Sequence, residues 1–268
     1  QVCLGLLAVV GLLIAILEQG GYNLLPETLH LEQISLDSLN HYLGRRTRRH
    51  ITIETLVAAE AMFAHAKGEK DHGDVGGDRM SAKKHNYSPT YAKYISRLLS
   101  NATLPGEVGI AEVGILTGTG LAMWSHLFPR HHIFGFDKIT ASYFNNLDHL
   151  KKLGFQDNKT LVQKFDQLAK RQLAHELLQK TFGSAIRLEI VVDDGYHVPL
   201  AGELTFLNFL PFMADRFVYF IEDIYKESHV MVGWEASLRR MISSGCPECE
   251  SVIECPPKSS KAECIIAI

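Results

Sequence analysis

The amino-acid sequence predicts an α/β protein built on a doubly wound, mostly parallel sheet of seven strands. The first observation behind this prediction is a pair of strand-like runs, near residues 188–193 and 217–222, that each end in acidic residues. The second is a run near 108–113 that passes through a glycine-rich turn into an apolar helical segment. Open α/β sheets bind ligands at the carboxyl ends of their strands, so both observations also indicate where a site would lie.

The other elements alternate along the chain, as a doubly wound sheet requires. Apolar residues recur with helical spacing over 51–67, and Ser88 and Pro89 predict the start of a helix that runs to about residue 100. Strands are predicted near 108–113, 132–136, 160–165, 188–193 and 217–222, and later helices near 141–153, 167–181, 200–214 and 233–243. Residues 250–254 and 263–268 flank a proline-containing turn, which predicts a closing antiparallel hairpin.

The amino-terminal part is predicted to be an extension of this sheet domain. Residues 2–17 carry no charge, and the sequence begins with Gln1 rather than Met. Because about 20 apolar residues span a bilayer, this segment is interpreted as a signal anchor or signal-peptide core, the alternative being a helix buried against the domain. We therefore expect a membrane-anchored protein, in an endomembrane or lumenal setting, or a cytoplasmic one if the segment belongs to the core.

The predicted organisation has three parts: an apolar segment at 1–22, a helical connector at 23–75 and a catalytic domain at 76–268. The chain has 268 residues, 46% of them hydrophobic, which is enough for a large core, and its net charge of −3 gives no footprint for nucleic acid. Four of the five cysteines follow residue 245. Disulfides, free thiols and a zinc site are all open for Cys246, Cys249, Cys255 and Cys264, with zinc the least favoured.

The two acidic strand ends predict a metal site. The sequence Asp193-Asp194-Gly195-Tyr196-His197 follows one strand, and Glu222-Asp223 ends the next. If these strands are parallel neighbours, Asp194, Glu222 and Asp223 converge, and three carboxylates suit Mg²⁺ or a similar hard cation. The alternative is that these acids are helix N-caps, which Asp also favours.

The glycine-rich turn predicts a nucleotide-type cradle. Gly114, Gly118 and Gly120 follow the strand that ends near Glu112, and Asp137 ends the next strand, where it suits ribose hydroxyls. The spacing fits neither the dinucleotide fingerprint nor the phosphate-binding P-loop.

These motifs resemble a known family. Glu112-Val-Gly114 with Gly118, followed by Phe134-Gly-Phe-Asp137, is similar to the S-adenosylmethionine site of class I methyltransferases. Further motifs resemble the metal-dependent sugar O-methyltransferases of macrolide biosynthesis, within a set often labelled cephalosporin-hydroxylase-like. These are Gly77-Asp78-Arg79 with His85 and Tyr87, then Asp166-Gln167, Asp193-Asp-Gly-Tyr-His197 and Glu222-Asp223. The resemblance covers residues 76–225, and it departs from the family at Tyr196, where a small Ser is usual.

The resemblance implies a role for each matching residue. His197 is expected as the general base, and Asp194, Glu222 and Asp223 as ligands of Mg²⁺. The residues expected to bind S-adenosylmethionine are Asp78, Tyr87, Glu112, Gly114, Gly118, Asp137, Asp166, Gln167 and Asp193.

The expected function is therefore S-adenosylmethionine- and Mg²⁺-dependent O-methyl transfer to a small-molecule hydroxyl, on a sugar-like, polyol or phenolic acceptor. Association with a membrane through residues 2–17 is expected, and the sequence leaves the oligomeric state open. Two alternatives come from other classes: a catalytically inactive binding module at a membrane, and a metal-dependent hydroxylase. Because iron oxygenases use two histidines and one carboxylate, the single His among acids at the strand ends disfavours the hydroxylase.

Overall fold

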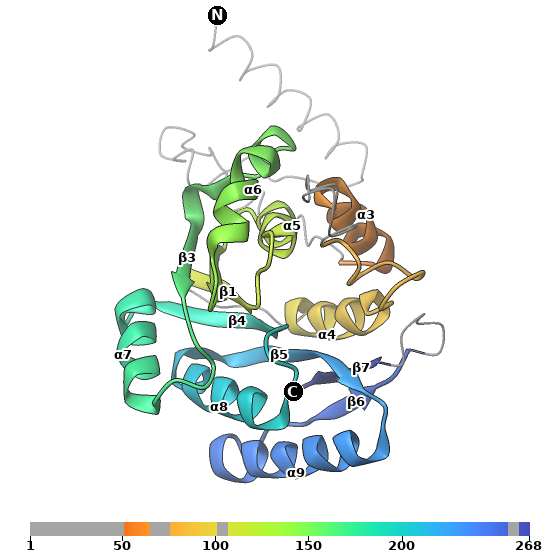
Figure 1. The fold of residues 1–268 in the computed structure, drawn as a ribbon, viewed down its shortest axis with the longest axis vertical. Coiled ribbons are helices and arrows are strands. Elements are labelled where there is room, and N and C mark those ends of the chain that lie inside the picture. The colour runs from red at the N-terminus through yellow and green to blue at the C-terminus, as the bar shows by residue number, and fades with distance from the viewer. Residues whose placement is uncertain (1–50, 65–75, 101–106, 257–262) are drawn as a thin grey trace, which may run out of the picture. The chain divides into compact units, whose positions relative to one another are not determined.

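The central sheet confirms the predicted fold class. The structure is a computed structural model that describes residues 51–64, 76–100, 107–256 and 263–268. Its seven-stranded sheet has the order β3-β2-β1-β4-β5-β7-β6 (Figure 1). The strands are β1 (Glu107–Val113), β2 (His132–Asp137), β3 (Thr160–Lys164), β4 (Ile186–Asp193), β5 (Met213–Tyr225), β6 (Val252–Glu254) and β7 (Glu263–Ala267). Strands β1 to β5 pair in parallel, and the β6–β7 hairpin joins β5 through antiparallel pairing, as predicted.

Helices cover both faces of the sheet, so it is doubly wound. The helices are α3 (Ile53–Phe63), α4 (Ser88–Ser100), α5 (Thr119–Leu127), α6 (Ala141–Lys152), α7 (Arg171–Phe182), α8 (Pro199–Phe209) and α9 (Ser228–Gly245), with short 3-10 turns at Asp157–Lys159 and Leu210–Phe212. Helices α3 to α6 share one apolar cluster with the sheet, and α7 to α9 share a second cluster on the opposite face. The predicted helix over 200–214 ends earlier because Pro211 lacks the N–H that a helix interior needs.

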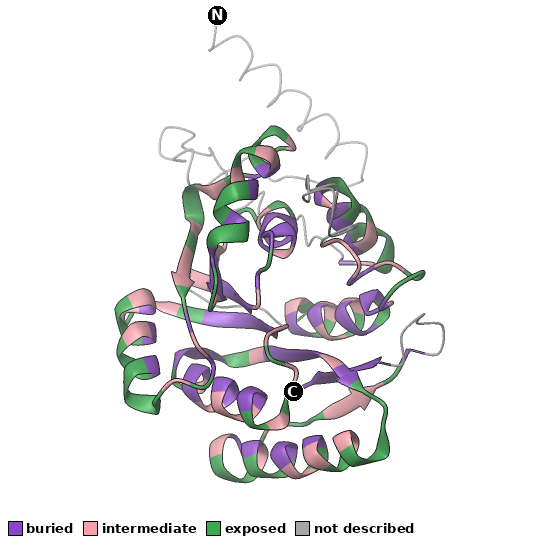
Figure 2. Cartoon of the chain, in the orientation of Figure 1, coloured by how far each residue is buried: buried purple, intermediate pink, exposed green. Residues whose placement is uncertain are grey.

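The strands at the middle of the sheet are buried on both faces. Consecutive residues of β4 point to opposite faces, so Val191 belongs to one apolar cluster and Val192 to the other. Trp124 anchors the cluster under α5, and Trp234 anchors the one under α9, and both indoles are fully buried. Figure 2 shows this burial along the strands and on the inner faces of the helices, while the outward faces are exposed.

Helix α3 belongs to the sheet domain although its residues fall in the predicted connector. Its Leu56 and Phe63 are fully buried in the same cluster as Tyr91 of α4 and Trp124 of α5. Thr52 caps its start in a capping box with Thr55. The packed domain therefore includes this helix and the residues it contributes.

The expected membrane localisation is wrong. Among the residues that the structure describes, no helix is long and apolar enough to cross a membrane. The segment 2–17, on which that expectation rested, lies outside the described residues. The expected association with a membrane is likewise unsupported.

The carboxyl-terminal cysteines form two disulfides, Cys246–Cys249 and Cys255–Cys264. The first closes the turn after α9. The second joins β7 to the residue that follows β6, so it fastens the hairpin at the edge of the sheet. Of the three states left open by the sequence, the structure has the disulfides.

The turns after β1 and β4 touch each other at the carboxyl edge of the sheet. Val113 pairs with Asp193, and the N–H of Asp194 donates to the carbonyl of Val113 at 2.8 Å. Gly114 has φ +85°, and a Cβ on it would lie 1.9 Å from the carbonyl oxygen of Asp194. Only glycine satisfies both the backbone and the contact at this position.

We predict that Gly114→Ala is much more destabilising than Gly183→Ala. Both glycines have a positive φ that L side chains rarely adopt, so both changes carry a backbone cost of about 1–3 kcal/mol. Only Gly114 has a close neighbour, since a Cβ on Gly183 meets no atom within 4 Å. The steric clash should add about 1–3 kcal/mol to the loss for Gly114→Ala. Urea unfolding of both variants measures this, and equal losses would contradict the close approach.

Candidate active site

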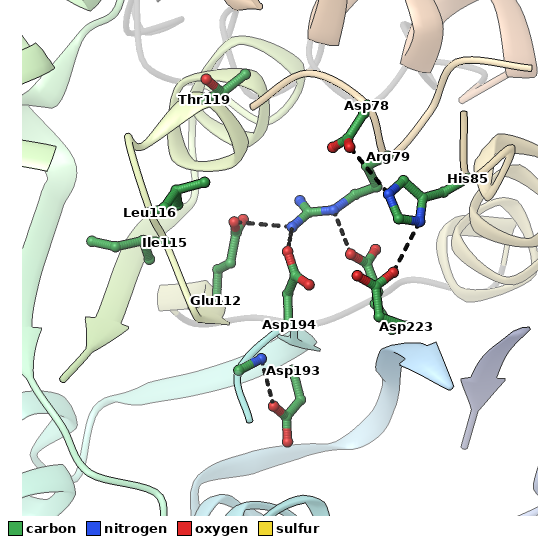
Figure 3. A network of polar contacts seen from close by, with 12 residues as sticks. Asp78, Arg79, His85, Glu112, Ile115, Leu116, Thr119, Asp193, Asp194 and Asp223 are labelled. Atoms are coloured by element: carbon green, nitrogen blue, oxygen red, sulfur yellow. Dashed lines mark hydrogen bonds and ion pairs between the residues drawn. The ribbon is translucent and has the colours of Figure 1, made fainter. Parts of the chain in front are cut away.

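A pocket lies at the carboxyl edge of the sheet, where both predicted sites were expected. Its walls come from the turn after β1, the ends of β4 and β5, helix α3 and the loop 76–87. In Figure 3, Glu112 and Asp194 point toward Arg79, and Asp223 points toward His85. The structure therefore brings the glycine turn and the two acidic strand ends together in one place.

Arg79 lies at the centre of this pocket and contacts three carboxylates. Its Nε donates to Glu222 at 2.8 Å, and its Nη2 donates to Asp194 at 3.0 Å and to Glu112 at 3.2 Å (Figure 3). Burial opposes its charge, but Glu112 and Glu222 hold the pKa of Arg79 well above its usual value. One guanidinium thus joins the ends of β1, β4 and β5.

The carboxylates around Arg79 are held by further buried donors. The indole Nε1 of Trp124 donates to Glu112 at 2.7 Å, and the hydroxyl of Tyr91 donates to Glu222 at 2.5 Å. Burial raises the pKa of Glu222 above its usual range, and burial likewise raises the pKa of Asp194 to about 7, although Arg79 lowers both. Arg79 therefore leaves part of the negative charge of this site uncompensated, which favours binding of another cation.

The loop 76–87 closes over the metal-site end of the pocket through His85. The Nδ1 of His85 lies 2.9 Å from Asp223 and 2.9 Å from Glu263, and its Nε2 lies 3.1 Å from Asp78. Burial opposes its charge, yet hydrogen bonds to Asp223 and Asp78 raise the pKa of His85 to about 10. His85 is therefore protonated at neutral pH and ties the loop to β5 and β7.

Tyr87 supports Asp223 rather than lining the pocket. Its hydroxyl donates to Oδ1 of Asp223 at 3.0 Å and lies 3.2 Å from the backbone N of Asp223, which donates to it. Tyr87 is fully buried. The role expected for Tyr87 was cofactor binding, and the structure instead gives it the position of a support for an acidic residue.

Asp194, His197 and Asp223 bring three ligand atoms within 4.8 Å of one another. His197 and Asp223 have φ values of +53° and +55°, an uncommon conformation that often marks functional sites. Nδ1 of His197 is buried and has no hydrogen-bond partner among the described residues. Glu222, expected as the third metal ligand, is outside this group, because its carboxylate is bound by Arg79 and Tyr91.

The predicted ribose acid, Asp137, holds the glycine turn in shape. Its Oδ2 accepts the backbone N–H groups of Ile115 at 3.0 Å and Leu116 at 3.3 Å, and its Oδ1 accepts that of Ile139 at 2.9 Å. Gly118 follows this turn with φ +84°, and a Cβ there would lie 2.4 Å from the Tyr143 ring. The turn is thus fixed before any ligand binds.

Gln167 and Asp193 lie beneath the pocket in a buried network. The amide of Gln167 donates to Asp193 at 2.7 Å and to Thr205 at 2.8 Å, and its oxygen accepts the N–H of Tyr196 at 2.8 Å. The other oxygen of Asp193 accepts the Tyr219 hydroxyl at 3.1 Å. Both residues were expected to bind the cofactor; in the structure these bonds tie the turn after β4, and neither residue is part of the pocket lining.

Asp166 instead lies near the surface, beside Lys138. Its carboxylate is 3.3 Å from the ammonium of Lys138, which also donates to the hydroxyl of Tyr196 at 2.9 Å. Three loops, which follow β2, β3 and β4, are linked by these contacts. Asp166 therefore remains a candidate for contact with a bound nucleoside.

Sequence reasoning gave no role to Arg79, Tyr91 and Glu60, all of which the structure puts at this site. Glu60 of α3 lines the pocket, and Tyr91 of α4 holds Glu222. A signal was present for Arg79, because three acids predicted to converge require a compensating cation. No comparable signal pointed to Glu60, since its helix is far from the motifs in sequence.

Comparisons with known proteins relate the chain to O-methyltransferases. No family model matches the chain. Among curated proteins, the mycinamicin VI 2''-O-methyltransferase of Micromonospora griseorubida is 25% identical over 146 residues, which are 53% of this chain and 32% of that protein. The chain thus spans about a third (32%) of the length of this curated relative.

Solved structures extend the comparison to the fold. The MycE methyltransferase from the mycinamycin biosynthetic pathway, in complex with Mg and SAH, matches with a TM-score of 0.52 and 15% identity over 91% of this chain and 67% of that one. The chain has the class I methyltransferase fold. A second MycE structure, with Mg, SAH and mycinamycin VI, matches with a TM-score of 0.51 and 18% identity over 91% of this chain and 63% of that one. The resemblance to methyltransferases that the motifs predicted is confirmed.

We predict that His85 stabilises the fold most at low pH. Its folded pKa of about 10 is above the unfolded value of about 6.5, so its contribution is fully present below pH 6.5 and is lost as the pH rises toward 10. His85→Gln should therefore lower the melting temperature more at pH 6.5 than at pH 10. His229→Gln, an exposed change on α9, is the control. A pH-independent difference would contradict a charged His85.

Proposed function

We propose that the chain is an S-adenosylmethionine-dependent O-methyltransferase that uses Mg²⁺ or a similar divalent cation. The observation that carries the proposal is one pocket lined by both the glycine turn after β1 and the acidic ends of β4 and β5. The fold shared with MycE, which was solved with Mg and SAH, supports it. So does the sequence match to the mycinamicin VI 2''-O-methyltransferase.

The residues around the glycine turn fit the methyl donor. Gly114 lets the turns after β1 and β4 approach, and Gly120 leaves room for Glu112, since a Cβ on it would lie 2.2 Å from that carboxylate. Asp137 would bind the ribose hydroxyls with the acceptor capacity left on its carboxylate, and Asp166 would lie near the adenine. Gly118 keeps the turn in shape, and Asp78 lines the same pocket from the loop 76–87.

Asp194 and Asp223, with Glu222 beside them, fit a divalent cation. Their carboxylates converge, their site carries excess negative charge, and Nδ1 of the adjacent His197 lacks a partner among the described residues. The ion would compete with Arg79 for Asp194 and Glu222. When bound, it would supply Lewis acidity that lowers the pKa of an acceptor hydroxyl.

His197 is the proposed general base. The turn after β4 holds it in a left-handed conformation next to Asp194 and Asp223, so its imidazole is near any hydroxyl bound at the acids. It would take the proton of the acceptor hydroxyl, and the oxygen would then attack the methyl carbon of the donor as the carbon–sulfur bond breaks and SAH leaves. Holding the two substrates in line supplies much of the rate.

The proposed acceptor is a hydroxyl of a sugar-like, polyol or phenolic small molecule. A metal-dependent hydroxylase is less well supported. The described part of the chain has two clusters of possible metal ligands, Asp194 with His197 and Asp223, and His85 with Asp223 and Glu263. Neither cluster contains two histidines. An inactive binding module would bind the donor without turning it over, which a transfer assay separates.

We predict that Asp223→Asn strongly weakens cation binding while donor binding survives. Asn tolerates the left-handed backbone at this position, so the fold should persist. By calorimetry, Mg²⁺ affinity should fall on the order of 100-fold, and SAH affinity should change little. Asp215→Asn, an exposed change on the same strand, is the matched control. The methyltransferase proposal fails if the unaltered protein does not bind SAH.

We predict that His197→Asn slows turnover by about 10²–10⁴-fold, the usual range for a general base. Asn again suits the positive φ, so SAH and Mg²⁺ affinities should stay nearly intact. The assay follows SAH formation with a panel of glycosides and catechols, and His229→Asn is the control. Loss of cation binding in this variant would make His197 a ligand instead, and unchanged turnover would require another base.

A further inference from the structure

Helix α3 contributes a buried carboxylate to the pocket that the preceding arguments do not use. Glu60 is 5% exposed and lines the pocket together with Asp78 and Glu112. It lies in the part of the chain that the sequence assigned to a connector, before the residues that carry the motifs. Carboxylates are rarely buried unless they are paired, because removing the charge from water is costly.

The position of Glu60 identifies the end of the pocket that it serves. The lining includes Thr117 and Thr119 at the start of α5 but neither Asp137 nor Asp166, the proposed ribose and adenine acids. A Cβ on Gly76 would lie 2.8 Å from Oγ1 of Thr119, so the loop 76–79 packs on the start of α5. Glu60, which accepts the N–H of Met80, therefore lines the pocket beside this loop, and neither proposed nucleoside acid is part of the lining.

The partners of Glu60 leave its charge uncompensated. Its Oε2 accepts the backbone N–H of Met80 at 2.8 Å. The ion pairs among the described residues include none made by Glu60, although the charge of Arg79 acts on it from a distance. Burial raises the pKa of Glu60 to about 7, against the lowering effect of Arg79. This carboxylate gains from an incoming cation.

Glu112, the pocket acid that the sequence predicted as a donor-binding residue, has fewer free acceptor sites for a ligand than Glu60. Its Oε2 accepts the indole of Trp124, and its Oε1 accepts the guanidinium of Arg79. Glu60 is bound by a backbone amide instead, and a carboxylate offers about four acceptor sites. Of the two, Glu60 is the better acceptor for a new charged donor.

We propose that Glu60 binds the α-ammonium group at the methionine end of the methyl donor. The inference rests on the proposed function, which places S-adenosylmethionine in this pocket, and adds a residue from α3 to its recognition. An ammonium is a compact cation with three donors, and a buried carboxylate binds it by a charge-assisted hydrogen bond. Helix α3 thereby becomes part of the donor site.

The test combines a change in the protein with a change in the ligand. Glu60→Gln keeps the volume and an oxygen that accepts the Met80 N–H, so it removes mainly the charge. The ligands are SAH and its analogue that lacks only the α-amino group. Calorimetry should show SAH affinity on the order of 10- to 100-fold lower for Glu60→Gln, with the analogue's affinity unchanged. Glu54→Gln, exposed on the same helix, should alter neither.

Each outcome decides a separate question. An equal loss for both ligands would mean that Glu60 only supports the loop, and it would overturn the inference. The unaltered protein gives a test that does not depend on how the variant folds: it should bind the analogue on the order of 10- to 100-fold more weakly than SAH. Equal binding would also overturn the inference while the proposed function stands. If neither ligand binds, the proposed function itself fails.

Discussion

The site depends on one constraint, the compensation of several carboxylates that the sheet forces together. Parallel β1, β4 and β5 end side by side, so Glu112, Asp194 and Glu222 meet at one edge. Arg79 contacts all three and compensates part of their charge. A buried guanidinium with multiple carboxylate partners is costly to break, because each acid would be left with an unpaired buried charge. The arrangement therefore holds the loop 76–87 against the sheet.

The same loop joins the two halves of the proposed reaction site. Arg79 contacts Glu112 on the donor side and Asp194 on the cation side. His85, which follows Arg79 by six residues in the chain, contacts Asp223. A divalent ion that enters beside Asp194 would add positive charge next to the guanidinium, so the two cations compete for the same oxygens. Occupation of the proposed metal site would therefore affect the position of the loop through charge.

Rigid supports lie under the groups that would react. Gln167, Asp193 and Tyr219 fix the turn after β4, and Tyr87 fixes the end of β5. These polar side chains are buried and hydrogen-bonded, which is the condition under which polar groups stabilise a unique arrangement. Several residues that the motifs marked for ligand binding serve this purpose. The motif is therefore partly a binding site and partly its support.

The sequence by itself determined the sheet, its helices, the closing hairpin and the two acidic strand ends, because each rests on local periodicity, turn chemistry or strand-end position. Only the tertiary structure decided the pairing of the cysteines, the diversion of Asp193 and Gln167 into support, the engagement of Glu222 by Arg79, and the entry of Glu60 into the pocket. These features depend on which side chains meet across long stretches of chain. Burial and charge balance settle such contacts, and neither is visible in a local pattern.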